Sequence, residues 1–349
     1  MAASDYFDLP DTGEMLESQF REQGWSYKRI DSNGVKDYKQ VNFGPNLDPG
    51  SPTFGKDMIF EETKYYPNKQ QKMSKQDEFK LPDDISEVDK NKPPLDLVIV
   101  SIPKMGKGTI LGQFTKEFNG LVFDLEKGGY EYIEAKKISI YSSAETSRWE
   151  AYQNYIQYRK VLLEQKGKYK YLIIDGLTDL DDLSEIGGTL AYMDTVQGKS
   201  FNRVRGAKDG EKLKFDDPAW KSVLTLGEGY GYQHTRAWFL QQIEFFRQIS
   251  PYRIYAAHVT DKMIKDNGKE EVVGSEIALT GKLKTIFAAK VTSLAKLIAD
   301  GEKRYLNFDV ANDSIIAGSR APHLTGKILI STKEKDGKIV TFWENIYKK

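Results

Sequence analysis

The sequence contains no cysteine and only three histidines among its 349 residues. Disulfide bonds and thiolate metal centres are therefore excluded, and a zinc site built from histidines is not expected. No run of about 18 apolar residues is present, so we expect no transmembrane helix and no membrane association. The first residues, MAASDYFDLPDTGEM, lack the basic start and apolar core of a secretory signal. These absences favour a protein of the cytoplasm.

Proline is scarce beyond the N-terminal quarter, because eight of the twelve prolines lie in residues 1–94. The same region carries 13 Lys or Arg and 18 Asp or Glu, a net charge of −5, which residues 95–349 balance with +5. This composition predicts a loop-rich N-terminal arm over residues 1–92, with a small hairpin that turns at Asn33-Gly34. The arm is either a tail with a small ordered piece or a segment that docks on another protein or subunit.

Beyond the arm, short apolar runs alternate with helical patterns. The runs are rich in β-branched residues, which is typical of strands buried on both faces of a parallel sheet. They lie at residues 95–100, 120–123, 171–174 and 252–257. Helical spacing of apolar residues separates them, for example at Ile110, Phe114 and Phe118. The sequence therefore predicts an α/β fold with a mostly parallel sheet flanked by helices over residues 93–326.

The first predicted strand runs directly into a glycine- and lysine-containing loop and then a helix. This is the context that a phosphate-binding P-loop requires, since backbone N–H groups and a helix N-terminus then face the anion. The pattern G-x-x-x-x-G-K-[ST] is only partly kept: Ser101 replaces the first glycine, and Gly108 replaces the hydroxyl residue that ligates Mg²⁺. Thr109, one place later, is then the candidate hydroxyl for the metal. The predicted nucleotide-binding residues are Pro103, Lys104, Met105, Gly106, Lys107, Gly108 and Thr109.

Acidic residues end two of the other predicted strands. Asp175 follows the run at 171–174, where a carboxylate can hold Mg²⁺ directly or through water. Asp124 and Glu126 follow the run at 120–123, and one of these carboxylates can polarise an attacking water. Ligands of open parallel sheets sit at the carboxyl ends of the strands, so the loop and the acids are expected in one cleft.

The order of these motifs resembles phage-encoded RecA-like P-loop NTP-binding proteins, which are related to the RecA-like single-strand annealing and recombination ATPases. The resemblance covers roughly residues 95–326. The family's P-loop commonly reads Gly-x-Pro-Lys-x-Gly-Lys-[Thr/Ser], which Ser101 and Gly108 depart from. Five further segments carry the resemblance: the Phe-Asp-Leu-Glu at 123–126, the Ile-Ile-Asp-Gly at 173–176, the Gly-Tyr-Gly at 229–231, the His-x-x-x-Lys at 258–262 and the Leu-Thr-Gly-Lys at 279–282, with Arg320 near the end of the domain.

The resemblance implies a role for several residues. Lys107 contacts the β- and γ-phosphates of ATP, Asp175 lies near Mg²⁺, and Glu126 activates water. His258 senses the γ-phosphate or couples it to DNA. Lys282 and Arg320 meet a phosphate in their own or a neighbouring subunit, because proteins of this kind bind nucleotide between the subunits of a ring or filament.

A basic segment is the candidate for contact with single-stranded DNA. Residues 199–214 contain six basic and two acidic residues, and such a loop can neutralise phosphates. Its alternative interpretation is a solvated surface loop. The DNA-binding candidates are Lys199, Arg203, Arg205 and Lys208. A second, less basic candidate is the segment 262–284, in which Asp266-Asn267-Gly268 indicates a hairpin.

The C-terminal residues 327–349 have the pattern of a β-hairpin that turns at Asp336-Gly337, and we expect a structural appendage there. For the whole chain, the expected function is a phage-type, DNA-dependent ATPase that aids annealing, recombination or replication in the host cytoplasm. The alternative is a catalytically degenerate nucleotide-binding protein that serves as a structural component of a phage assembly, which Gly108 favours. A small-molecule kinase is a weaker third hypothesis, because no arginine-rich lid is evident.

Overall fold

The structure of the chain is a computed structural model that describes residues 25–32, 35–45, 57–66, 89–204, 212–215, 217–266, 269–309 and 317–347. The chain divides into two units, Met1–Glu87 and Val88–Lys349. Three antiparallel strands lie in the first unit, in the order β1 (Trp25–Ser32), β2 (Val35–Pro45) and β3 (Asp57–Tyr66). The turn predicted at Asn33-Gly34 falls outside the described residues, but β1 and β2 pair on either side of it.

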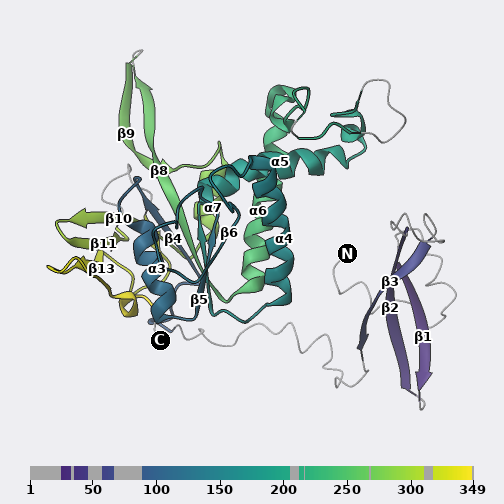
Figure 1. The fold of residues 1–349 in the computed structure, drawn as a ribbon, viewed down its shortest axis with the longest axis horizontal. Helices are drawn as coiled ribbons and strands as arrows, with labels where there is room; N and C mark the ends of the chain where they lie inside the picture. Colours follow the sequence, from purple (N-terminus) through teal and green to yellow (C-terminus); the bar gives the residue numbers. More distant parts are fainter. Residues whose placement is uncertain are drawn as a thin grey trace, which may run out of the picture. The chain divides into compact units, whose positions relative to one another are not determined.

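The second unit is built on an 11-stranded sheet, whose central strands run parallel in the order β10-β4-β8-β7-β5-β6 (Figure 1). Their bounds are β4 Asp96–Ser101, β5 Gly120–Asp124, β6 Lys137–Ser139, β7 Tyr171–Asp175, β8 Tyr252–Asp266 and β10 Ser293–Asp300. The apolar runs of β4, β5 and β7 are buried along their whole length. The mostly parallel sheet that the sequence predicted is therefore confirmed.

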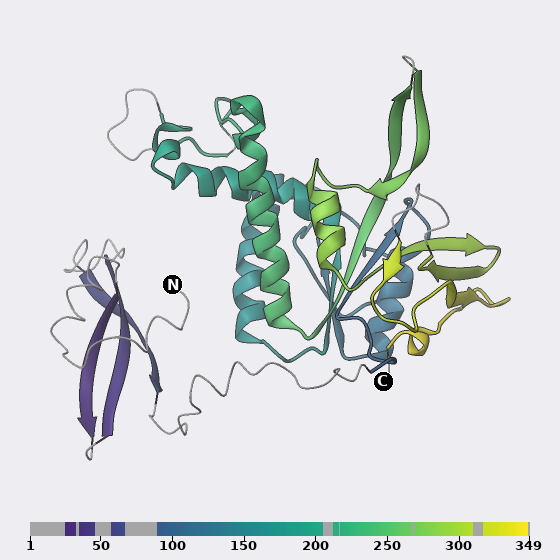
Figure 2. The same cartoon turned by 180° about the vertical axis from the view of Figure 1, so that it is seen from behind.

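Helices cover both faces of this sheet (Figures 1 and 2). The alternation of side chains along β4 separates two cores, because Val98 and Val100 join one cluster while Leu97 and Ile99 join the other. Helix α3 (Lys107–Glu117) packs on the second cluster. The first cluster is covered by α4 (Arg148–Glu164), α5 (Leu177–Met193), α6 (Gly231–Ile249) and α7 (Leu283–Lys290). No helix among the described residues is long and apolar enough to cross a membrane.

Antiparallel strands extend the sheet beyond β10. They are β11 (Lys303–Asn307), β13 (Lys327–Lys333) and β14 (Ile339–Thr341), while β12 (Gly318–Ser319) pairs with the start of β10. The pair β13–β14 flanks the predicted turn at Asp336-Gly337. After β14, Trp343 is fully buried and donates a hydrogen bond from Nε1 to the Ile110 carbonyl of α3, at 3.1 Å. The C-terminal residues thus complete the core beneath α3.

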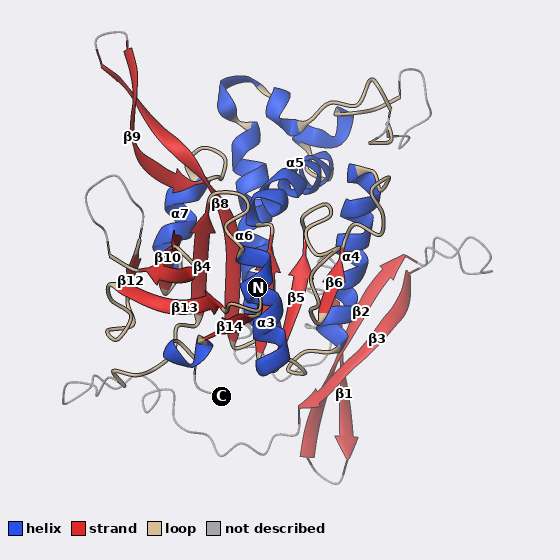
Figure 3. Ribbon diagram, turned by 60° about the vertical axis from the view of Figure 1, so that its left-hand side comes forward, coloured by secondary structure: helices blue, strands red, loops and turns tan. Residues whose placement is uncertain are grey.

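Strand β8 continues past the sheet and pairs with β9 (Lys269–Ile277) as an antiparallel ribbon that projects from the body of the unit (Figure 3). The hairpin that the sequence indicated near Asp266 is confirmed, since Asp266 pairs with Lys269. Because β8 also belongs to the central sheet, one strand links the centre of the sheet to the base of the ribbon.

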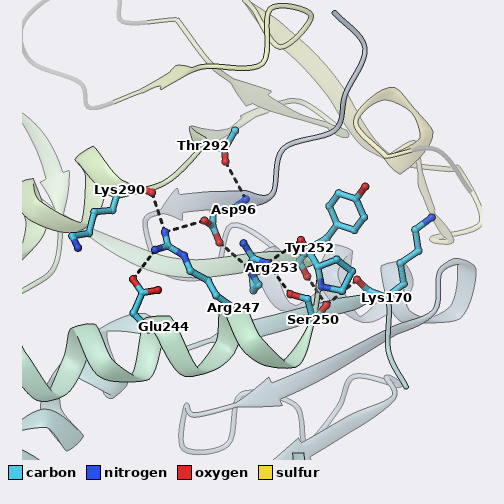
Figure 4. Close-up of polar contacts among 10 residues, drawn as sticks. Asp96, Lys170, Glu244, Arg247, Ser250, Tyr252, Arg253, Lys290 and Thr292 are labelled. Carbon is cyan, nitrogen blue, oxygen red and sulfur yellow. Dashed lines mark hydrogen bonds and ion pairs between the residues drawn. The ribbon is translucent and has the colours of Figure 1, made fainter. Parts of the chain in front are cut away.

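A buried ion-pair network holds the amino ends of the central strands together (Figure 4). Asp96 of β4 accepts hydrogen bonds from Arg253 Nε of β8 at 2.8 Å and from an Arg247 guanidinium nitrogen of α6 at 3.0 Å. Arg247 also donates to the Lys290 carbonyl at the end of α7. Asp96 and Arg253 are 4% and 6% exposed, so each charge depends on its partner for compensation.

Candidate nucleotide-binding site

The loop between β4 and α3 has the backbone of an anion cradle. Lys104 and Gly106, on either side of Met105, have positive φ angles of 65° and 86°, and turn conformations of this kind can direct backbone N–H groups toward one side. Gly106 caps α3 without a side-chain hydrogen bond, and the first turn contains no acidic residue. The first N–H groups of α3 are thus left for an anion, whose charge the helix dipole also favours.

Lys107, the first residue of α3, points to two carboxylates. Its Nζ lies 3.3 Å from Glu126 Oε1 and 3.4 Å from Asp175 Oδ1. Lys107 and Asp175 are buried, with side chains 7% and 2% exposed, whereas Glu126 is partly exposed. Lys107 therefore compensates the charge of the buried Asp175, whereas Glu126 remains partly accessible to solvent.

Strand register brings these acids to one level of the sheet. Asp124 of β5 pairs with Asp175 of β7, which pairs with Ala256 of β8. On the other side of β8, Ser101 of β4 is level with His258. His258 Nε2 lies 3.2 Å from Glu126 Oε1. Strands β4, β5 and β7 thus end at the same level of the sheet, where β8 runs on into the ribbon, as expected for the carboxyl ends of parallel strands.

The acids differ in proton affinity. Burial raises the pKa of Glu126, but the hydrogen bond with His258 and the charge of Lys107 outweigh it and lower the pKa to about 2. Burial raises the pKa of Asp124 to about 6 and the pKa of Asp179 to about 7, where the charges of Glu126 and Asp182 add to the effect. Burial also raises the pKa of Asp175, against the charge of Lys107. The site holds more carboxylates than cations, which favours a cationic ligand.

Two further contacts shape the acid cluster. Tyr130, buried in the loop after β5, donates a hydrogen bond from its hydroxyl to Asp175 Oδ2 at 2.8 Å. Gly176, at φ 96°, caps the N-terminus of α5, and a Cβ there would lie 2.9 Å from both Asp179 Oδ2 and Glu126 Cγ. A side chain at this position would therefore force the two acid-bearing segments apart.

The donor set suits Mg²⁺ bound together with a phosphate ligand. Asp175 Oδ1 is buried and its partner is Lys107 Nζ at 3.4 Å, so this oxygen becomes free for a metal ion when the lysine turns to a phosphate. Within the described residues, no group of three or more His, Cys, Asp or Glu side chains forms a metal cage. Mg²⁺ needs no such cage, because it is commonly held by one or two carboxylates, water and substrate phosphates.

A family model described as an AAA domain matches residues 94–321, which is more than half of the chain. The chain belongs to the AAA domain family. A search among curated proteins found no match. An AAA domain is a P-loop domain of the nucleotide-binding, ATPase type, so this part of the sequence prediction is confirmed. ATP, typically with Mg²⁺, is the ligand that such a domain implies.

The other P-loop residues of this AAA domain differ in exposure and direction. Pro103 and Lys104 are exposed, and Met105 is half-buried, with its carbonyl accepting a hydrogen bond from Arg304 Nε of β11 at 3.2 Å. Gly108 faces the acids, since a Cβ built on it would lie 3.9 Å from Asp175 Oδ2. Thr109 lies about 100° further around the helix. Thr109 is half-buried there, and its role as a metal ligand stays a prediction.

The basic candidates lie in the segment between α5 and α6. Lys199 and Arg203 are exposed at the end of the 3-10 turn Gln197–Ser200, where Arg203 Nε donates to the Lys199 carbonyl at 2.7 Å. Arg205 and Lys208 lie outside the described residues. Contact of this segment with DNA stays a prediction.

Lys282 and Arg320 occupy different ends of the sheet. Lys282 is exposed at the start of α7. Arg320 donates to the Ala289 carbonyl at 2.7 Å, beside the start of β10. Since β10 and β4 are parallel, this is the end of the sheet opposite the P-loop. Arg320 is therefore not brought to the chain's own Lys107, and a contact with a neighbouring subunit stays a prediction.

Three residues at the site were not predicted from the sequence, namely Tyr130, Asp179 and Arg304. Tyr130 follows Glu126 closely, so its place in the same loop was visible, but nothing local shows that its hydroxyl turns back to β7. Asp179 lies in the first turn of α5, only four residues after Asp175 at the end of β7, and this closeness in sequence could have indicated a second acid near the site. Arg304 reaches the P-loop from a strand 199 residues away, and no sequence pattern signals it.

Proposed function

We propose that this protein binds and hydrolyses ATP in the site at the start of α3, and that it acts as a DNA-dependent ATPase in annealing, recombination or replication of phage DNA. The observation that carries the ATPase part is the position of Lys107. It opens a helix with an uncapped N-terminus and lies within 3.4 Å of carboxylates from two strand ends. Lys107 thus lies next to both the groups that would bind phosphate and the carboxylate that would activate water.

Binding begins with the phosphates. The free N–H groups of the loop and of α3 bind the oxygens of the phosphate chain, and Lys107 moves its charge from the carboxylates to the outer phosphates. Glu126 then keeps His258 as its partner. Because the charge of Lys107 contributes to the low pKa of Glu126, this pKa rises toward its ordinary value when the lysine turns away. Nucleotide binding thereby makes Glu126 a better proton acceptor.

Hydrolysis is in-line attack of water on the γ-phosphorus. Glu126 accepts the proton as the bond between water oxygen and phosphorus forms, and the bond to the β–γ bridging oxygen breaks. Bound Mg²⁺, held by Asp175, would neutralise charge on the β- and γ-phosphates. Lys107 stabilises the charge that develops on the leaving ADP oxygen and on the γ-phosphoryl group.

The DNA part of the proposal rests on the basic segment and on the resemblance to phage RecA-like proteins. Lys199 and Arg203 are exposed cations, and single-stranded DNA binds to basic surfaces through its phosphates. A ring or filament of chains would place nucleotide between subunits, where Lys282 or Arg320 of a neighbouring chain could reach it.

The test is ATP hydrolysis with Mg²⁺, measured with and without single-stranded DNA. We expect turnover that DNA stimulates and that Lys107→Ala abolishes. Turnover that is indifferent to DNA would leave an ATPase and remove the DNA role. Turnover unchanged in Lys107→Ala would place the activity outside this site.

A second candidate function is nucleotide binding without turnover, as a structural component of a phage assembly. Gly108 favours it, because the P-loop lacks the hydroxyl that ordinarily ligates Mg²⁺. Measurable binding of ATP together with no phosphate release under any DNA condition would support this candidate over the first.

A further inference from the structure

The P-loop of this protein lacks a side chain where a hydroxyl would be expected. Gly108 is the second residue of α3, and a Cβ built on it would lie 3.9 Å from Asp175 Oδ2 and 3.8 Å from Tyr130 Cζ. A serine or threonine here would extend its hydroxyl into the space between Asp175 and Tyr130. The position thus points at the carboxylate that suits Mg²⁺.

The Tyr130 side chain fills this space. Its hydroxyl donates to Asp175 Oδ2 at 2.8 Å, and the residue is 2% exposed. The second oxygen of the carboxylate, Oδ1, has no hydrogen bond and faces Lys107. The phenol therefore brings a hydroxyl to the carboxylate next to Gly108, from the loop after β5 instead of from α3.

Other contacts fix the tyrosine in place. Lys137 donates from Nζ to the Tyr130 carbonyl, and the same Nζ lies 5.7 Å from the centroid of the Tyr130 ring. Ile133 donates its backbone N–H to the Tyr130 carbonyl at 3.4 Å, and its Cδ1 would be 3.1 Å from a Cβ at position 108. A serine at 108 would therefore require only the end of the Ile133 side chain to shift by a few tenths of an ångström, while Tyr130 and Asp175 lie at ordinary contact distance.

From this geometry we propose that the Tyr130 hydroxyl compensates for the missing P-loop hydroxyl by orienting the Asp175 carboxylate that would hold Mg²⁺, without itself binding the ion. Tyr130 is a positioning residue that acts through Asp175: its hydrogen bond holds Oδ2, so that Oδ1 is presented to the ion. The inference rests on the proposed nucleotide site. If Tyr130 has this role, a glycine at position 108 does not imply that the site has lost Mg²⁺ binding.

The test compares nucleotide affinity with Mg²⁺ and with EDTA, using an ATP analogue that carries a fluorescent ribose label. Tyr130→Phe should lower the affinity measured with Mg²⁺ by on the order of 10- to 100-fold, the range for losing a partner that orients a metal ligand. The affinity in EDTA should stay as in the unmodified protein. Tyr132→Phe is the matched control, because Tyr132 is in the same loop and 96% exposed, and it should change neither value.

Position 108 supplies a rescue and an independent variant. Adding Gly108→Ser to Tyr130→Phe should restore most of the Mg²⁺-dependent affinity, since the phenylalanine leaves room for a serine hydroxyl near Asp175. Gly108→Ser alone should bring no gain, because the site already has its hydroxyl. A tenfold gain in that single variant would overturn the proposal, even where Tyr130→Phe fails to fold.

Two outcomes separate this inference from the proposed function. If the unmodified protein binds nucleotide with Mg²⁺ but Tyr130→Phe keeps the same Mg²⁺ effect, only the role of Tyr130 is refuted. The same holds if Tyr130→Phe weakens binding equally in Mg²⁺ and in EDTA, which is the result of a merely structural role. If the unmodified protein binds no nucleotide in either condition, the nucleotide site itself is refuted and the inference with it.

Discussion

Lys107 Nζ lies 3.3 Å from Glu126 Oε1, so the lysine that is proposed to bind phosphate is ion-paired with the acid that is proposed to activate water. This ion pair couples phosphate binding by Lys107 to water activation by Glu126. While Lys107 stays with Glu126, the carboxylate is a weak proton acceptor, because the lysine contributes to its low pKa. A phosphate that draws Lys107 away releases the acid at the moment when a substrate is present. Binding of ATP thus makes Glu126 a stronger proton acceptor.

The first prediction concerns Glu126→Gln. The amide cannot accept the proton of the attacking water, so turnover should fall by on the order of 10²- to 10⁴-fold. ATP should bind at least as tightly as before, because Lys107 no longer has to leave a charged partner. Rapid-quench measurement of phosphate release, together with equilibrium binding, checks both effects. Glu131→Gln changes an exposed acid of the same loop and should leave both unchanged; loss of binding in Glu126→Gln would contradict the coupling.

The sheet and the P-loop could be predicted because their signals are local. Strands β4, β5 and β7 are apolar runs buried on both faces, and Lys107 follows one of them within a single loop. The acids at strand ends could be placed together for the same reason, since parallel strands share one carboxyl edge. Local sequence thus predicted that the P-loop lysine and the acids at the strand ends lie together.

Other features could not be predicted, because they depend on contacts between residues far apart in the sequence. The hydrogen bond between Tyr130 and Asp175 spans 45 residues, and the pair Asp96–Arg253 spans 157. Trp343 meets Ile110 across 233 residues. In each case the sequence around one residue gives no sign of which distant residue it contacts. The direction of Gly108 toward Asp175 is equally hidden, since it depends on how α3 is rotated against β7.

The second prediction is a pH dependence of stability from Asp179. Its pKa is about 7 in the native state against an ordinary value of 3.8. Between these values the native state keeps a proton that the unfolded chain has lost, so the free energy of unfolding falls as the pH rises through this window. Asp179→Asn removes the group that titrates. The melting temperature of the variant should therefore fall less between pH 4 and pH 7 than that of the unmodified protein.

The comparison is made without nucleotide, with melting temperatures recorded across that window. The charges around Asp179 are those of Glu126, Asp182 and His258, and they remain in the variant, so the difference between the two curves isolates Asp179. Asp300→Asn alters an exposed aspartate at the end of β10 and should follow the unmodified curve. Parallel curves for Asp179→Asn and the unmodified protein would show that Asp179 titrates as an ordinary exposed acid.

The third prediction concerns the buried network at the amino end of the sheet. Asp96→Asn leaves the Arg253 and Arg247 guanidinium groups without their shared carboxylate. Breaking such a buried pair costs about 3–5 kcal/mol in free energy of unfolding. Urea unfolding followed by circular dichroism measures the change. Lys212→Ala, which breaks an exposed pair with Asp194, should cost far less, and equal costs would mean that the Asp96 network is solvated in solution.

The last prediction tests the basic segment between α5 and α6. Replacing its four DNA-binding candidates with alanine should weaken binding of single-stranded DNA, because each lysine or arginine neutralises a phosphate and releases counterions. The slope of log affinity against log salt concentration should become shallower by about 3, at about 0.7 for each contact to single-stranded DNA. Fluorescence anisotropy of a labelled oligonucleotide, over a series of salt concentrations, gives both values. The replaced residues are Lys199, Arg203, Arg205 and Lys208.

A matched variant removes the same charge from another part of the surface. It replaces four exposed lysines of the C-terminal hairpin, namely Lys327, Lys333, Lys335 and Lys338. Because both variants lose four positive charges, a purely non-specific attraction of DNA to net charge would weaken binding equally in the two. A contact surface at residues 199–208 requires the first variant to lose the greater part of both affinity and salt dependence, since only there do cations lie against phosphates. DNA-stimulated ATP turnover should follow the same order, because stimulation requires DNA to be bound at the segment.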